Sequence, residues 1–228
     1  VTKDPPVFYH PDFLQSFSDL TGKKVKILAG FVDKKLKLAL PIFEENGIAN
    51  NLSLSGWDNL EPVGNVHLME IDQLFEALLD HYDGIILRNF LTINIANFEV
   101  KFAEEVPSFR CPIYDLPSSE EELRKQVNKM TKRKINACAN NGISFNVYMM
   151  EKLPVADRLS KFEQLIILHN DRFAQKGKKS IFNRDESAKF HDILFTQKNA
   201  AASFIIEAET EEKEVIGSLY GFFSKDRI

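Results

Sequence analysis

The sequence is poor in the features that build cross-linked, metal-bound or membrane-spanning proteins. It has two cysteines, Cys111 and Cys138, which are too few for a disulfide framework, and no Cys/His spacing is typical of a zinc site. No apolar run is long enough to cross a bilayer, and the N-terminus lacks the basic-then-apolar pattern of a signal peptide. We therefore interpret the chain as cytoplasmic, with reduced thiols and no transmembrane segment.

Acidic residues are also missing from one long stretch, between Leu123 and Met150, although the whole chain has a formal net charge of −4. The first half of this stretch is crowded with basic residues instead: Arg124, Lys125, Lys129, Lys132, Arg133 and Lys134. Such a cluster can steer an anion by its long-range field, or it can simply be a solvated polar face. Sequence-specific binding of nucleic acid is not expected, because the chain is acidic overall and has no reader motif.

Charge is divided unevenly along the chain. Residues 1–115 hold 10 Lys and Arg against 17 Asp and Glu, a net charge of −7. Residues 116–228 hold 19 against 16, a net charge of +3. This asymmetry, with Pro117 between the halves, predicts two units, 1–115 and 116–228, with different surfaces.

Apolar periodicity predicts that each half mixes helices and strands. In the first half we expect helices at 12–20 and 71–82, and strands at 25–32, 36–43, 49–54, 84–90, 100–102 and 108–114. A hairpin turn at 33–35 would join the first two strands. In the second half we expect strands at 143–149, 203–208 and 215–223, and helices at 157–175 and 185–199.

The acid-free stretch predicts one long helix ahead of these elements. Ser118 and Glu121 have the spacing of a capping box, and Gly142 supplies a left-handed stop after Asn141. The apolar stripe of this helix would include Met130 and Ile135. Lys134 falls among the apolar positions, so its side chain is expected to point toward the core, where either its stem snorkels to solvent or its charge meets a specific partner.

From residue 143 the expected order is strand, helix, helix, strand, strand, as in the opening of the GNAT acyltransferase fold. Three segments resemble those of the acetyltransferase-like family of CelD-type proteins of cellulose and exopolysaccharide synthesis, which is related to the Fem-type peptidyltransferases. They are Arg124…Lys132-Arg133-Lys134-Ile135…Gly142-Ile143-Ser144-Phe145, Leu168-His169-Asn170-Asp171-Arg172-Phe173, and Val215-Ile216-Gly217-Ser218-Leu219-Tyr220-Gly221-Phe222.

This resemblance implies an α/β (α+β) fold of two tandem GNAT-like units, with mixed, mainly antiparallel sheets flanked by helices. Residues 1–115 would be a degenerate unit and residues 116–228 a unit truncated at its C-terminus. The family binds the pyrophosphate of acyl-CoA at a Gly-rich loop before a helix. That loop would lie beyond Ile228, so the sequence assigns no cofactor-binding residue.

Seven residues are candidates for a site. His169 is a candidate proton acceptor and lies one helical turn from Arg172, a candidate anion clamp. Tyr220 could act as a general acid. The remaining candidates would bind an anionic substrate: Arg124, Lys132, Arg133 and Lys134. A structural role is the alternative for each, with His169 half-buried, Arg172 paired to an aspartate and Tyr220 in the core.

The resemblance implies an acyl-CoA-dependent N- or O-acyltransferase, using acetyl-CoA or another acyl-CoA. Its acceptor would be a small-molecule, lipid-linked or nucleotide-linked anionic precursor of the cell envelope or of a polysaccharide. One alternative is aminoacyl-tRNA-dependent peptidyl transfer of the Fem type. Another is a non-catalytic binding module that has kept the fold alone.

Overall fold

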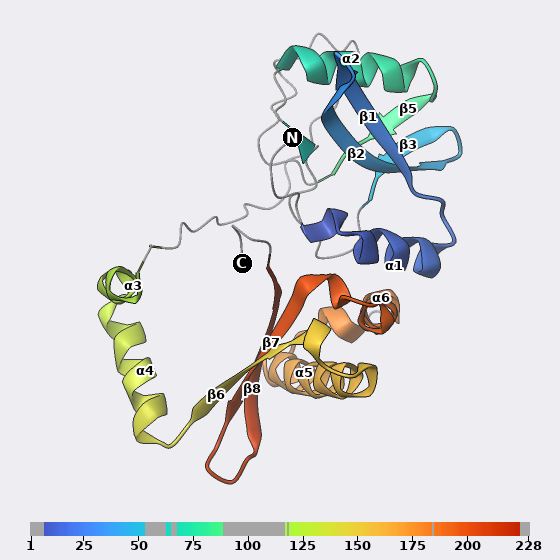
Figure 1. Cartoon of the computed structure of the whole chain (residues 1–228). Helices are drawn as coiled ribbons and strands as arrows, with labels where there is room; N and C mark the ends of the chain where they lie inside the picture. The colour runs from blue at the N-terminus through green and yellow to red at the C-terminus, as the bar shows by residue number, and fades with distance from the viewer. Residues whose placement is uncertain are drawn as a thin grey trace. The chain divides into compact units, whose positions relative to one another are not determined.

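The computed structural model describes residues 7–52, 63–64, 68–88, 117, 119–183 and 185–223 (Figure 1). Within these ranges the chain forms six α-helices and two sheets, which confirms the predicted α+β class. The strands expected at 100–102 and 108–114 lie outside the described residues. Short 3₁₀ helices occupy Val7–Tyr9, Met150–Lys152, Ile181–Asn183 and Ala200–Ala202.

The chain divides into two compact units, but not at a single boundary. The first unit contains residues 1–109, 181–202 and 222–228, and the second contains residues 110–180 and 203–221. The sequence placed a boundary near residue 116 and assigned the helix at 185–199 to the second half. The helix that forms there, α6 (Asp185–Thr196), belongs instead to the first unit, where it packs against α1 (Pro11–Thr21).

The first unit is built on a mixed sheet of five strands. Strands β1 (Lys26–Val32), β2 (Lys35–Glu45) and β3 (Ile48–Asn51) are antiparallel neighbours, and β5 (Gly84–Ile86) runs parallel to β3. The short β4 (Val63–Gly64), which the sequence did not predict, pairs with β2. The expected hairpin is confirmed: Asp33 and Lys34 both have positive φ, as a two-residue turn between right-twisted strands requires.

The core of the first unit is apolar and rich in phenylalanine. Helix α1 contributes Phe13 and Phe17, which are 1% and 2% exposed, and α6 contributes Phe190 and Leu194. Helix α2 (Leu68–Leu79) contributes Leu78. Figure 1 shows α1 and α2 flanking the strands of this unit, so the sheet is covered from two sides.

The single long helix expected at 118–141 is two helices. Helix α3 (Glu120–Gln126) is capped by Ser119 rather than Ser118, and its Oγ accepts from the amide of Glu122. Helix α4 (Lys129–Asn140) starts at a new cap, where Asn128 accepts from the amide of Thr131. Neither helix has a buried residue, and Figure 1 shows both standing apart from the strands of their own unit.

The second unit holds a three-stranded antiparallel sheet in the order β6-β7-β8. Its strands are β6 (Ser144–Met149), β7 (Ser203–Glu209) and β8 (Val215–Phe222), and the long helix α5 (Val155–Gln175) packs along one face. Phe162 of α5 meets the ring of Tyr220 edge to face at 6.0 Å between centroids. The opposite face exposes Phe145 and Val147.

No helix in the described part of the chain has the length and hydropathy needed to span a membrane. The same residues contain no group of three or more His, Cys, Asp or Glu side chains placed to hold a metal ion.

Candidate functional site

The strongest arrangement of reactive groups lies at the C-terminal end of α5. His169 projects from the last two turns of this helix, and its Nδ1 lies 2.8 Å from Oγ of Ser180. The imidazole also stacks on Phe173, with 4.3 Å between ring centroids. The ring is therefore held by a hydrogen bond on one nitrogen and by an aromatic surface, which fixes its orientation.

A left-handed turn brings Ser180 back to His169. Gly177 has φ of +64°, and the amide of Lys178 donates to the carbonyl of Phe173 at 2.9 Å, which closes the end of the helix. A residue with a side chain would be strained at this φ. The chain thus reverses directly after α5 and buries Ser180, which is 4% exposed.

The electrostatics keep this imidazole neutral. Partial burial of His169 lowers its pKa, and the positive charge of Arg172 lowers it further. A neutral imidazole has one nitrogen that can accept a proton at neutral pH, as a general base requires.

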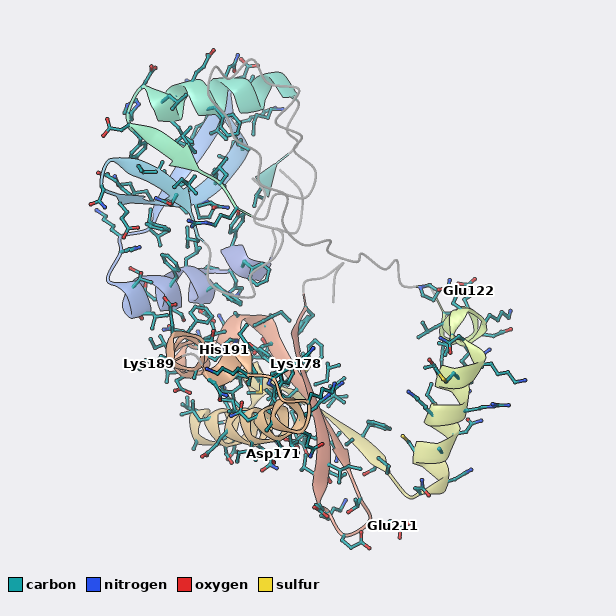
Figure 2. All side chains as sticks on the ribbon, turned by 180° about the vertical axis from the view of Figure 1, so that it is seen from behind. Glu122, Asp171, Lys178, Lys189, His191 and Glu211 are labelled. Carbon is teal, nitrogen blue, oxygen red and sulfur yellow. The ribbon has the colours of Figure 1, made fainter. Side chains whose placement is uncertain are left out.

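Exposed cations surround this end of the helix. Arg172 is followed by three exposed lysines in the turn, namely Lys176, Lys178 and Lys179. Asp171, which Figure 2 labels together with Lys178, is the one acidic residue among positions 171–180. A proton acceptor beside several positive charges suits a substrate that carries both an anionic group and a nucleophile that must lose a proton.

The structure distributes the predicted basic residues over two helices. Arg124 lies on α3, where its guanidinium pairs with Glu120 at 2.8 Å, so its charge is already balanced locally. Lys132, Arg133 and Lys134 lie on α4 and are all exposed. The prediction that Lys134 points toward the core is wrong, because α4 has no buried side. These three residues therefore lie on a different helix from His169, which belongs to α5.

Helix α4 ends as the sequence predicted. Gly142 has φ of +67°, and the amide of Ile143 donates to the carbonyl of Cys138 at 3.0 Å. A Cβ at Gly142 would collide with the carboxylate of Glu211, in the turn between β7 and β8. The end of the basic helix therefore lies next to an acidic turn of the same unit.

Tyr220 lies in packing between β8 and α5. Burial raises the pKa of its phenol well above the usual range, and its ring contacts Phe162. A phenol in this position is held protonated and shielded from water. These observations favour the structural alternative for Tyr220 over the general acid.

The sequence analysis did not predict two features of this region. Ser180 carries no motif of its own, although the Gly177 stop after a helix bearing His169 was a usable signal. The second is a polar cluster under α5, where Nζ of Lys161 lies 2.8 Å from Glu207 and 3.4 Å from the ring centroid of Tyr148. The hydroxyl of Tyr148 lies 3.5 Å from a carboxylate oxygen of Glu209.

This polar cluster joins α5 to the sheet through charge. Glu207 is 3% exposed and Glu209 is 8% exposed, so both carboxylates are nearly withdrawn from water. Cross-strand register places Tyr148 and Glu207 on the α5 side of neighbouring strands. The cluster therefore positions the helix that carries His169.

Comparison with known proteins adds no family. No protein-family model matches the chain, and no curated protein or solved structure matches it significantly.

Proposed function

We propose that the chain is an acyltransferase that moves an acyl group from acyl-CoA to an amine or hydroxyl, with His169 as general base. The observation that carries this proposal is the short contact between Nδ1 of His169 and Oγ of Ser180. If Nδ1–H donates to the serine oxygen, the lone pair lies on Nε2, where it can accept the proton of the attacking nucleophile.

The acceptor in this proposal is an anionic precursor of the cell envelope or of a polysaccharide. Arg172 and the three lysines of the following turn support an anionic acceptor, because they provide positive charge beside the base. Ser180 is a positioning residue, since it acts through the imidazole rather than on the substrate.

Catalysis would consist of alignment and proton transfer. The nucleophile is held against the thioester carbonyl while His169 removes its proton, and the CoA thiolate leaves and is protonated. The chain segment that would bind CoA has not been assigned.

Acyl transfer is tested by following CoA release from acetyl-CoA with glucosamine 6-phosphate or glucosamine as the acceptor amine. We expect His169→Gln to reduce kcat by about 10²–10⁴-fold, the usual contribution of a general base. Ser180→Ala should lower kcat and shift the pH profile, while Ser180→Thr, which keeps a hydroxyl, should retain most of the rate. Preference for the phosphorylated amino sugar should fall in Arg172→Gln.

The outcome against the proposal is equally definite. Wild-type release of CoA that is unchanged by His169→Gln would exclude the general base, and no detectable heat on titration with acetyl-CoA would exclude the donor.

The exposed cations of α4 favour a second candidate, the Fem-type transfer from aminoacyl-tRNA. Binding of aminoacyl-tRNA without acetyl-CoA binding would select it, and binding of neither would indicate a non-catalytic module.

A further inference from the structure

The β1–β2 hairpin of the first unit is a basic island in an acidic region. Between Leu20 and Phe43 the chain has six lysines and one acidic residue, Asp33, whereas residues 1–115 as a whole have a net charge of −7. Two of these lysines are paired within the unit, since Lys23 contacts Glu45 at 2.9 Å and Lys26 contacts Glu44 at 2.8 Å. No ion pair is recorded for the other four, all of which lie in the described range: Lys24, Lys34, Lys35 and Lys37.

The same hairpin exposes large apolar side chains at its tip. Phe31 is 63% exposed, Val32 is 46% exposed and Leu36 is 39% exposed, and Phe31 lies directly opposite Leu36 in the register. Exposed apolar side chains that lie together indicate an interaction surface more strongly than scattered ones do.

The strip continues along one face of β1. Side chains two residues apart share a face of a strand, so Ile27, Ala29 and Phe31 point the same way, and all three are exposed. The alternate side chain, Leu28, packs toward the core. The bulge that skips Lys37, between the Gly30 and Phe31 pairs, keeps Phe31 and Leu36 paired at the tip.

We propose that this hairpin tip, Phe31 to Lys37, docks on an anionic lipid surface. The exposed apolar side chains at the end of the hairpin can enter the boundary between lipid headgroups and acyl chains, while the neighbouring lysines remain among the anionic headgroups. The positive turn within an otherwise acidic half supplies the charge complementarity that a negative leaflet requires.

A second copy of the chain fits this surface less well. Among the described strands β1 is an edge of its sheet, so antiparallel self-pairing is geometrically open. Pairing of two β1 strands would bring together two hairpins that each carry six lysines against one aspartate between Leu20 and Phe43. Repulsion between these like charges opposes such pairing.

Sedimentation of the full chain with lipid vesicles tests this docking. We expect binding to vesicles of phosphatidylcholine and phosphatidylglycerol in equal parts, weak binding to phosphatidylcholine alone, and release at high salt. Phe31→Ser with Val32→Ser should weaken binding at least tenfold. Lys34→Glu with Lys35→Glu should weaken it at least 25-fold, since each lysine near an anionic surface contributes about fivefold.

Matched variants separate this hairpin from other exposed surfaces. Phe145→Ser removes an equally exposed phenylalanine, 60% exposed, from the other sheet, and Lys132→Glu with Arg133→Glu removes charge from α4. Both should change vesicle binding less than twofold. A Phe31→Trp variant should show a blue shift of its added fluorescence on anionic vesicles, which reports insertion even if another variant folds poorly.

The proposal is overturned by wild-type protein that ignores anionic vesicles, or by hairpin variants that bind like wild type. It is also overturned if only the α4 variant loses binding, which would place lipid contact on α4. Wild-type binding to single-stranded RNA without binding to vesicles would identify a different polyanion. None of these measurements depends on acyl transfer, so they stand or fall separately from the proposed activity.

Discussion

The two units bury different kinds of side chain. The interior of the first is apolar, and its buried polar residues include Asn51, whose amide pairs with both backbone groups of Arg88 at 2.8 and 3.0 Å. Among its described residues the second unit buries as many charged and hydroxyl side chains as apolar ones: Arg158, Ser180, Ser203, Glu207 and Glu209, beside Met150, Phe162, Leu165, Phe204 and Ile205. A polar interior is costly to form unless every group is paired.

This difference indicates a division of labour. The first unit uses buried polar groups to complete backbone pairing, as Asn51 does where the pairing of β3 with β5 ends. The second unit holds charged pairs and a His–Ser contact on or beside one helix, α5. Chemistry is therefore expected in the second unit, and the first supplies a stable body with an exposed hairpin.

The largest expected effect tests the charged interior of the second unit. Lys161→Met leaves the carboxylate of Glu207 buried without its cation, which should lower the free energy of unfolding by about 3 kcal/mol. Urea unfolding measures this loss, and hydrogen exchange should locate it in α5 and β6–β8.

Two further variants make this test sharper. Lys161→Met combined with Glu207→Leu should recover most of the lost stability, because an apolar pair replaces a charged one. Lys152→Met, at an exposed position, should have little effect. Equal losses in the single and double variants would show that the unpaired charge of Glu207 is not the cause of the loss, and would contradict this role of the ion pair.

A titrating histidine tests the apolar interior of the first unit. Burial of His191 lowers its pKa to about 4, against the smaller opposing effect of its hydrogen bond to the carbonyl of Ser187. The unfolded chain therefore takes up this proton near pH 6.5, and the folded chain takes it up only near pH 4.

Stability contributed by neutral His191 is fully present above pH 6.5 and is lost as the pH falls toward 4. The loss should reach about 3 kcal/mol, which unfolding at a series of pH values will measure. His191→Phe should flatten this dependence, whereas His81→Gln, at an exposed position, should leave it unchanged. A wild-type stability that is constant across this range would contradict the burial of His191.

The smallest effect concerns a strained turn after α6. Residues Ala200, Ala201 and Ala202 all have positive φ, which costs energy for residues with a side chain. A carboxylate oxygen of Asp12 accepts from the amides of Asn199 and Ala201, at 3.1 Å each, and holds this turn against α1.

Loss of this carboxylate should destabilise the first unit modestly. Asp12→Ala should cost about 1–2 kcal/mol in thermal or urea unfolding, because two amides lose their acceptor. Asp19→Ala, on the same helix, should cost less than about 0.5 kcal/mol, as is usual for an exposed site. A similar loss in both variants would show that the turn is held by packing alone.

Local sequence patterns predict a helix or strand correctly where apolar spacing, residue type and turn residues all indicate the same element. The hairpin followed from strand-forming residues on both sides of Asp33, and α5 followed from its apolar spacing. The long helix at 118–141 was wrong because its apolar stripe continues smoothly across Val127, while the Asn128 side chain caps a new helix there. The capping residue therefore ends one helix and starts another, although the apolar spacing continues across it.

The candidate site was predictable only where its residues share one helix. His169 and Arg172 are one turn apart, so spacing alone indicates that they can interact. Ser180 and Lys161 acquire their roles through a turn and a sheet, which position them against His169 and Glu207. Local patterns could not predict that α6 belongs to the first unit, because its contacts with α1 join residues far apart in the sequence.

The discontinuity of the first unit has a consequence for how the protein is made. The ribosome must synthesise residues 110–180 before α6 emerges to complete the first unit's core. Helix α1 and strand β2 leave the exit tunnel earlier, and their apolar side chains stay exposed until α6 follows. Phe190 and Leu194 of α6 then complete this interior. An expressed fragment that stops near residue 115 would lack this helix, and it should be insoluble or dependent on a chaperone.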